Sequence, residues 1–421
     1  MTILDQALEQ TFPSVFNRNG LIPDAVTVIA GTSVYDSWES IRINRTLEAL
    51  SSDFSISMAD KWRDSKSKWP LVPGTPLLVK IGRESVINGY IDTLDVSISN
   101  EDRVIQITGR DKTGDLVDSS AYSDPSEFKN IKLEALAKKF ATEIFGIKVK
   151  TEADTGLPFQ KFTIKQGETV FEMLERAAKL RGLLLLSNAN GDLVITSRSG
   201  GDIGDAPSLG SDAPSISKLT KAFDFPTGGL LKSEVALVQG ENILEARAAF
   251  DDTERFQTYF VKGQSAGSDI FNGKSVTQVS ATARDLAIKR SRTKILIADG
   301  SVDKTAAQKR ANWEAIVSAT RALEVNVKVQ GWQKSDGKLW DVNELIRVEA
   351  PFIGVDADLL TTNVTLLKSI DSGTITNIRL SRPDSYNASS KELSADSDPA
   401  NNLGWESQSI SAAIDAVRGL V

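Results

Sequence analysis

The chain of 421 residues contains no histidine and no cysteine, so its candidates for chemistry are carboxylates, hydroxyls and basic side chains. This excludes histidine-dependent hydrolases, cysteine-based zinc or iron–sulfur sites and imidazole-ligated metals. Two carboxylates alone can hydrolyse a glycosidic bond, but Asp92, Asp95 and residues 251–252 lie in no distinctive aromatic motif and are interpreted as solvated strand or turn residues. The sequence thus predicts no catalytic, cofactor-binding or metal-binding residue.

The densest run of special residues lies between Gly109 and Ala121. An enzyme would need a base and a nucleophile here, and neither would have a histidine partner. In the structural interpretation a strand ends at Gly109, Arg110 pairs with a nearby acid, and Asp111 or Thr113 caps a short helix. The structural interpretation is favoured.

A second run places Gly167, Glu168 and Thr169 between an apolar strand and a helix. It is similar to the start of a peptidoglycan-binding LysM repeat, so a glycan site is one alternative. The other is architecture, because an acid and a hydroxyl at a helix N-terminus accept hydrogen bonds from its unpaired N–H groups. A single element of this kind inside a larger α/β unit favours architecture.

The net charge of -7 makes the chain a poor candidate for gripping nucleic acid, which needs a basic surface. Asp5 and Glu9 stand where a signal peptide would be basic and then apolar. The longest leucine block, 183–186, is far shorter than the roughly 20 apolar residues that span a bilayer. We therefore expect a soluble protein made in a cytoplasm, with no membrane insertion.

Strand patterns dominate the stretch from Asp24 to Asp111. Apolar residues alternate with polar ones, which puts one face of each strand in a core and the other toward water or a partner. The inward residues are Ile41, Ile43, Phe54, Ile56, Met58, Leu94, Val96, Ile98, Ile105 and Ile107. Turn signals between these strands predict a small antiparallel barrel or sandwich.

The middle of the chain changes period. Leu133, Leu136, Phe140 and Ile144 follow the spacing of an amphipathic helix that ends at Gly146. A second helix is predicted from Val170 to Gly182, with strands at 183–186 and 193–196, so this is an α+β unit. Residues 199–229 are rich in Gly, Ser, Asp and Pro and are predicted to be a linker or surface loop.

Strands resume near Leu237 and at 256–261, and 305–323 is predicted to be helical. The clearest alternation follows at 323–330, and 346–348, 364–367 and 375–380 continue an antiparallel pattern. Two strand-rich blocks with similar turns therefore bracket the mixed middle. We take a distant internal duplication as a hypothesis, because the period alone is too loose to prove one.

Several ordered motifs resemble the Mu-type baseplate hub proteins of contractile-tailed phages, over about residues 25–385. They include 88–92, 109–113, 115–121, 167–169, 174–178, 182–184, 240–244, 254–256, 261–264, 309–314, 331–332 and 337–340. The residues that carry the resemblance are Gly89, Tyr90, Asp92, Gly109, Arg110, Asp111, Asp118, Gly167, Glu168, Thr169, Trp313, Gly331, Trp332 and Trp340. The arm before Asp24 and the tail after Asn387 lie outside it.

The resemblance implies a β-rich α+β fold with two tube-like antiparallel β-barrel domains bracketing a mixed α/β domain, assembled as a homotrimeric ring. Three copies of two similar barrels give six quasi-equivalent positions around one axis. The expected parts are an N-terminal arm (1–23), a first barrel (24–112), an α/β domain (113–210 with 246–320), a discontinuous second barrel (211–245 with 321–386) and a C-terminal linker and helix (387–421).

By the same resemblance the chain is a structural, non-enzymatic hub of the virion tail baseplate, assembled in the host cytoplasm. It would join the six-fold tail tube to the trimeric central spike and form part of the DNA ejection channel, without binding DNA specifically. The implied partners are the spike, the tail tube or its initiator, other baseplate proteins and a tape-measure protein. The alternatives are a tail-associated protein that binds or hydrolyses cell-wall glycan, and the hub of a phage-derived injection machine.

The C-terminal stripe Ile410, Ile414, Val417 and Val421 has helical spacing but is too short to be stable alone. It follows a polar linker at 387–402. The stripe is either a docking element for a neighbouring protein or a disordered tail.

Overall fold

The computed structural model describes residues 25–59, 71–98, 103–179, 183–196, 233–264, 278–301 and 322–383, with gaps at 32, 36–37 and 371. It also describes 16–17, 20–21 and scattered residues between 307 and 321. Several predictions concern residues outside these ranges: the 199–229 loop, Trp313, the 387–402 linker and the stripe of Ile410, Ile414 and Val417. Of the N-terminal arm, the structure describes only the short hairpin of β1 (Phe16–Asn17) and β2 (Gly20–Leu21).

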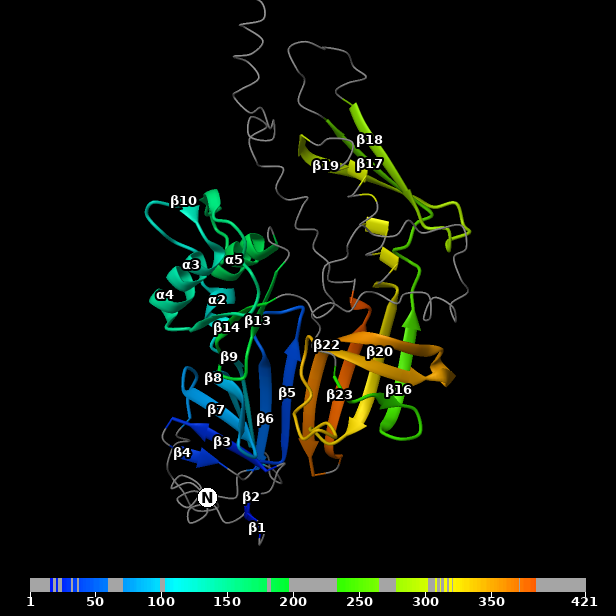
Figure 1. Cartoon of the computed structure of the whole chain (residues 1–421). Helices are drawn as coiled ribbons and strands as arrows, with labels where there is room; N and C mark the ends of the chain where they lie inside the picture. Colours follow the sequence, from blue (N-terminus) through cyan, green and yellow to red (C-terminus); the bar gives the residue numbers. More distant parts are fainter. Residues whose placement is uncertain are drawn as a thin grey trace, which may run out of the picture.

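Two strand blocks stand side by side and share one 13-stranded sheet (Figure 1). The first block contains β3 (Val26–Ala30), β4 (Ser33–Tyr35), β5 (Ser40–Thr46), β6 (Asp53–Ala59), β7 (Pro76–Ile81), β8 (Glu84–Ile98) and β9 (Arg103–Asp111). The second contains β15 (Leu237–Val238), β16 (Ile243–Phe250), β20 (Leu323–Gln330), β21 (Leu345–Ala350), the 3-10 turn η3 (Pro351–Ile353), β22 (Val355–Ser369) and β23 (Gly373–Ser381).

The two blocks have the same strand order. The first runs β3-β7-β8-β9-β6-β5 and the second β15-β21-β22-β23-β20-β16, so that the strands correspond one to one in chain order. Each block contains a 15-residue strand, β8 or β22, whose first half pairs with the strand that precedes it. The second half pairs with the 9-residue strand that follows it, β9 or β23. The blocks differ at one end, where β3 pairs antiparallel with β7 but the two-residue β15 pairs parallel with β21.

A β-bulge also recurs at the same place. In the β8–β9 ladder the register shifts between Ile91 and Thr93, and in the β22–β23 ladder it shifts between Thr361 and Asn363. A bulge bends its strand and increases the local twist. Shared strand order, strand lengths and bulge position support the hypothesis of an internal duplication.

The blocks meet edge to edge where β5 pairs antiparallel with the second half of β22. Ile43 lies opposite Leu366, and both side chains are buried. On the other face the side chains of Asn363 and Thr365 both donate to Asn44 Oδ1, at 2.9 and 3.0 Å. The joint is therefore apolar on one face and hydrogen-bonded on the other.

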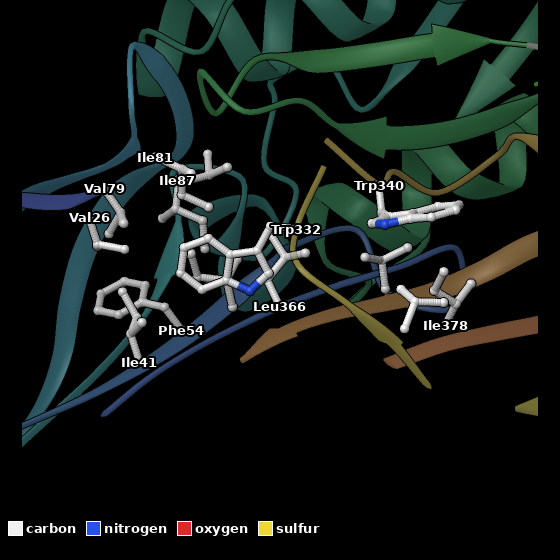
Figure 2. Packing of buried hydrophobic residues seen from close by; sticks show 14 of the residues in the cluster. Val26, Ile41, Phe54, Val79, Ile81, Ile87, Trp332, Trp340, Leu366 and Ile378 are labelled. Atoms are coloured by element: carbon white, nitrogen blue, oxygen red, sulfur yellow. The ribbon is translucent and has the colours of Figure 1, made fainter. Parts of the chain in front are cut away.

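One hydrophobic cluster runs through both blocks. It contains Phe54 and Ile41 from the first block and Ile378 and Leu366 from the second, and the ring of Trp332 is drawn between these groups in Figure 2. The alternation predicted for β6 and β20 is confirmed, because each inward residue of these strands is buried. The two blocks thus share a continuous core.

The prediction fails at the end of β8, where Val96 and Ile98 are 57% and 72% exposed in the single chain. The strand continues beyond the reach of β7, whose pairing stops at Tyr90, so this half of β8 has β9 on one side alone among the described residues. The apolar alternation continues through Val96 and Ile98, but no described part of the same chain covers these side chains.

The middle unit lies above the first block in Figure 1. Its elements are α2 (Gly114–Asp118), β10 (Glu127–Ile131), α3 (Leu133–Ala137), the π-helical turn η2 (Lys138–Thr142), α4 (Glu143–Phe145), β11 (Val149–Thr151), β12 (Phe159–Thr163), α5 (Val170–Lys179), β13 (Leu184–Ser187) and β14 (Leu193–Thr196). A second hydrophobic cluster fills it.

The predicted helix over 133–146 forms, with Leu133, Leu136 and Phe140 buried and Gly146 left-handed at its end. Ile144, however, is 57% exposed. The reason is the π-helical turn, which adds a residue to the turn and rotates the following side chains away from the face that a 3.6-residue period predicts.

The segment between β16 and β20 carries a three-stranded sheet in the order β18-β17-β19, from β18 (Gln278–Arg284), β17 (Thr258–Gln264) and β19 (Thr293–Ser301). The described residues among 307–321 are mostly helical, and Ala307, Ala311 and Ala315 pack on the sheet in a hydrophobic cluster of its own. The resemblance implied that residues 246–250 belong to the α/β domain, but they form part of β16 in the large sheet. In the described part of the chain no helix is long and apolar enough to cross a membrane.

Candidate functional site

Arg110 lies where the first strand block meets the middle unit, and it links three elements. Its Nε donates to Asp92 Oδ2 on β8 at 2.7 Å. Its two terminal nitrogens donate to the Asp118 carboxylate of α2, at 3.0 and 2.6 Å. This bidentate contact lowers the pKa of Asp118, and the hydrogen bonds to Asp118 and Asp92 raise the pKa of Arg110.

Asp111, the next residue, is buried and accepts hydrogen bonds from the start of the helix and from the loop before β6. Its carboxylate accepts from the Thr113 N–H at 2.8 Å and from Thr113 Oγ1 at 2.5 Å. It also accepts from the Ser52 N–H at 2.8 Å and Ser51 Oγ at 3.1 Å. Thr113 precedes the first helical residue, but its side chain makes no capping hydrogen bond to the helix. Of the two predicted caps, it is Asp111 that accepts a main-chain N–H at this turn.

Gly89 and Gly109 allow the β8 and β9 backbones to approach closely beside this network. A Cβ atom on Gly89 would lie 1.9 Å from the Arg110 carbonyl oxygen, and one on Gly109 would lie 2.1 Å from the Tyr90 carbonyl oxygen. Neither contact is possible for a real side chain, so both positions require glycine. These glycines, Tyr90, Asp92 and Arg110 are thereby brought together where the middle of β8 meets the end of β9.

A cleft of about 360 Å³ opens at this junction, lined in part by Pro73, Tyr90, Asp92, Arg110 and Asp115. Burial raises the pKa of Asp115 above its ordinary value. Asp92 and Arg110 are paired with each other, and Asp111 accepts hydrogen bonds from the main chain and from hydroxyl groups. No group of residues able to hold a metal ion is found in the described part of the chain. The Arg110 network of this cleft connects α2 to the sheet.

The Gly167–Thr169 turn starts α5 through a capping box. Thr169 Oγ1 accepts from the Glu172 N–H at 3.2 Å, and Glu172 Oε2 accepts from the Thr169 N–H at 2.8 Å. Gly167 has a φ of 83°, and Glu168 is paired with Arg176 at 2.7 Å. The polar groups of the turn thus make hydrogen bonds at the start of the helix, as an architectural role requires. This favours the architectural alternative over a glycan site. Glu172 was missed, although the Thr-x-x-Glu spacing in the sequence signals it.

The tryptophans of the second block are core residues. Trp332 is buried, and its Nε1 donates to the carbonyl oxygens of Leu367 and Ile375 at 3.0 and 3.2 Å. Gly331 precedes it with a φ of 79°, and Trp340 is buried in the same cluster. Trp332 and Trp340 lie in the shared core, whereas Arg110 lies in the cleft beside the middle unit, so the described motif residues are not gathered at one site.

The family models that match the chain follow it in order. A model of the Mu phage baseplate assembly protein GpP-like N-terminal domain matches residues 25–111. The second domain of baseplate hub protein gp44-like proteins matches 113–197. The fourth domain of the Mu phage baseplate assembly protein GpP matches 303–389.

Relatives cover nearly the whole chain. The baseplate hub protein gp44 of Escherichia phage Mu is 29% identical over 402 residues, which is 94% of this chain and 95% of that protein. The crystal structure of the 43 kDa tail protein of prophage MuSo2 from Shewanella oneidensis is 33% identical, with a TM-score of 0.70, and the match covers 86% of this chain and 99% of that one. A tail protein from Neisseria meningitidis MC58, 23% identical with a TM-score of 0.65 over 86% of this chain and 98% of that one, shares the fold. The chain therefore belongs to the Mu phage baseplate hub protein family and is a component of a Mu-like phage tail baseplate.

Proposed function

We propose that three copies of this chain form a ring that joins the six-fold tail tube to a trimeric central spike. The observation that carries the proposal is the repeated strand order of the two blocks, which places two equivalent units in each chain. Three chains then present six equivalent positions around one axis while the whole ring keeps three-fold symmetry. A tube could bind the six positions and a spike could use the three.

The ring would form part of the channel through which DNA leaves. DNA moving along a channel would stall on a basic wall, because lysine and arginine bind phosphate. The net charge of -7 supports an acidic lumen. A map of the surface potential of the assembled ring tests this, and a basic lumen would contradict it.

The middle unit and the three-stranded unit would lie outside the ring and shape its contacts with the spike and with other baseplate proteins. The network of Arg110, Asp92 and Asp118 supports a structural role, because it fixes the middle unit to the first strand block. We propose no catalytic residue in either unit. Incubation of the purified chain with cell-wall glycan in a zymogram tests this, and clearing would favour the glycan-hydrolase alternative.

The C-terminal stripe of Ile410, Ile414 and Val417 is proposed to dock on a neighbouring protein such as the spike, the tube or a tape-measure segment. Deletion of residues 403–421 should then impair tail assembly. Unchanged assembly and infectivity would show that the docking is unimportant.

Light scattering of the purified chain is the direct test of the ring. We expect a species of three chain masses at micromolar concentration. A monomer at every concentration, alone and after co-expression with the spike, would overturn the proposal.

A further inference from the structure

The second half of β8 has an open edge. Residues 93–98 pair with β9 on one side, and no other described strand pairs with them. The corresponding half of β22 is not open, because β5 of the same chain pairs with it on the side away from β23. Unpaired N–H and C=O groups along a strand are a template for another strand.

The strand that would fill this edge by equivalence is β16. It corresponds to β5 in the strand order and lies at the end of the large sheet, where β20 is its one partner among the described strands. It lies at the far side of the second block from β8, so it cannot reach β8 of its own chain (Figure 1). The chain already makes this joint once, between β5 and β22. The open edge of β16 corresponds to the β5 side of that joint, and the open edge of β8 corresponds to the β22 side.

The ladders of the two blocks fix how the residues correspond. Ile43 lies opposite Phe54 and Phe54 opposite Gly109, which faces Ile91 just before the first bulge. In the second block the same chain of pairs runs from Ala248 through Val325 and Leu380 to Thr361, just before the second bulge. Ala248 therefore corresponds to Ile43. Counting from the bulges, Val96 corresponds to Leu366.

We propose that β16 of one copy pairs antiparallel with residues 93–98 of β8 in a second copy, in the register of the β5–β22 joint. Since Ile43 lies opposite Leu366, Ala248 lies opposite Val96 of the next copy. The same register sets Ala246 opposite Ile98 and Phe250 opposite Leu94. The inference rests on the proposed trimer and names the contact that closes it.

The side chains on these two edges fit one another. Val96, Ile98 and Phe250 are 57%, 72% and 48% exposed in the single chain. Val96 lies opposite the buried Ile105 and Phe250 opposite the buried Leu323, so these side chains lie on the core face of the sheet, which the joint would extend. Ala246 and Ala248 are small where β8 offers the larger Ile98 and Val96, so the two rows can interdigitate. Ile43 and Leu366, which correspond to Ala248 and Val96, are fully buried in the β5–β22 joint within the chain.

The opposite face supplies charge complementarity. In the proposed register Arg247 lies opposite Ser97 and diagonal to Asp95, within reach of a long side chain. In the joint within the chain, Arg42 occupies the position that corresponds to Arg247. A head-to-tail contact of this kind closes into a ring when its rotation matches that of the joint it copies.

Paired cysteines test the register, because the natural chain has none. Opposed residues in an antiparallel ladder have Cα atoms about 4.5–5.5 Å apart, within the range of roughly 4.4–6.8 Å that a disulfide spans. The double variant Val96→Cys with Ala248→Cys should oxidise to a band of three chain masses on a non-reducing gel. The control, Val96→Cys with Ala249→Cys, places the second thiol on the other face and should remain monomeric on the gel.

A charge variant provides an independent readout without oxidation. Val96→Lys should convert the trimer to monomer in light scattering, with at least a tenfold weaker association. Ile144→Lys is a matched control, because Ile144 is also 57% exposed but lies on the middle unit. A wild-type trimer that neither cross-links through the 96–248 pair nor dissociates with Val96→Lys would overturn this inference and leave the ring standing. A wild-type monomer would overturn the ring itself.

Discussion

Arg110 and its neighbours converge on a cleft as catalytic residues would, but their contacts favour the structural role that we propose for them. Two carboxylates, a guanidinium and a buried aspartate converge on a cleft, as they would in an active site. The hydrogen bonds of Arg110, however, run between elements of the fold, from β9 to β8 and from β9 to α2. The close approach at Gly89 supplies the geometry that the network needs, because it sets the distance between β8 and β9.

Replacement of Gly89 by alanine should destabilise the protein. The new methyl group would meet the backbone of Arg110, which cannot move as a flexible side chain could, so we expect a loss of about 1–3 kcal/mol or more. Gly114→Ala is the matched control, since its Cβ would lie 3.4 Å from the Arg110 side chain, an ordinary contact. Urea unfolding measures both. Equal stability of the two variants would contradict the close-approach argument.

The ion pair of Arg110 and Asp118 should add stability that depends on pH. The pKa of Asp118 is lowered in the folded chain, so the contribution is present above the unfolded pKa and is lost as the pH falls through the folded value, below about 4. Asp118 is 59% exposed, and solvent screening keeps the effect below about 1 kcal/mol. Asp118→Asn should flatten this part of the stability profile. A variant with the wild-type acid slope would show that the pair contributes nothing.

At the scale of elements, the local patterns were predictable and the joints between them were not. Alternation in β6 and β20 and the helix at 170–179 follow from side-chain period, and the structure confirms them. The pairing of β5 with β22 joins residues more than 300 positions apart, and no local pattern encodes its register. The ion pair of Arg45 with Asp341 beside it was missed for the same reason. The π-helical turn that exposes Ile144 also depends on packing rather than on period.

Truncation of equivalent residues should separate the joint within the chain from the joint between chains. Leu366→Ala empties a buried site opposite Ile43, and we expect a loss of about 2–5 kcal/mol at any protein concentration. Val96→Ala, at the corresponding position of β8, should lower the free energy of unfolding only at protein concentrations where the chain is assembled. Unfolding curves over a range of protein concentrations measure this. A concentration-independent loss at Val96 equal to that at Leu366 would contradict the assignment of the open edge.

At the scale of the whole molecule, the chain contains a repeated unit whose two copies are already joined once. The shared core and the β5–β22 ladder hold the two blocks rigidly side by side (Figures 1 and 2). The exposed apolar end of β8 and the free edge of β16 lie at opposite ends of this pair. These two edges are the basis of our proposal that further copies of the chain add around an axis.

Class averages of the purified assembly by electron microscopy test the central claim most directly. The account predicts a closed ring of three chains whose strand layer shows six similar lobes around a central hole, with three-fold symmetry in the outer units. Two-fold particles, open filaments or isolated chains would contradict it.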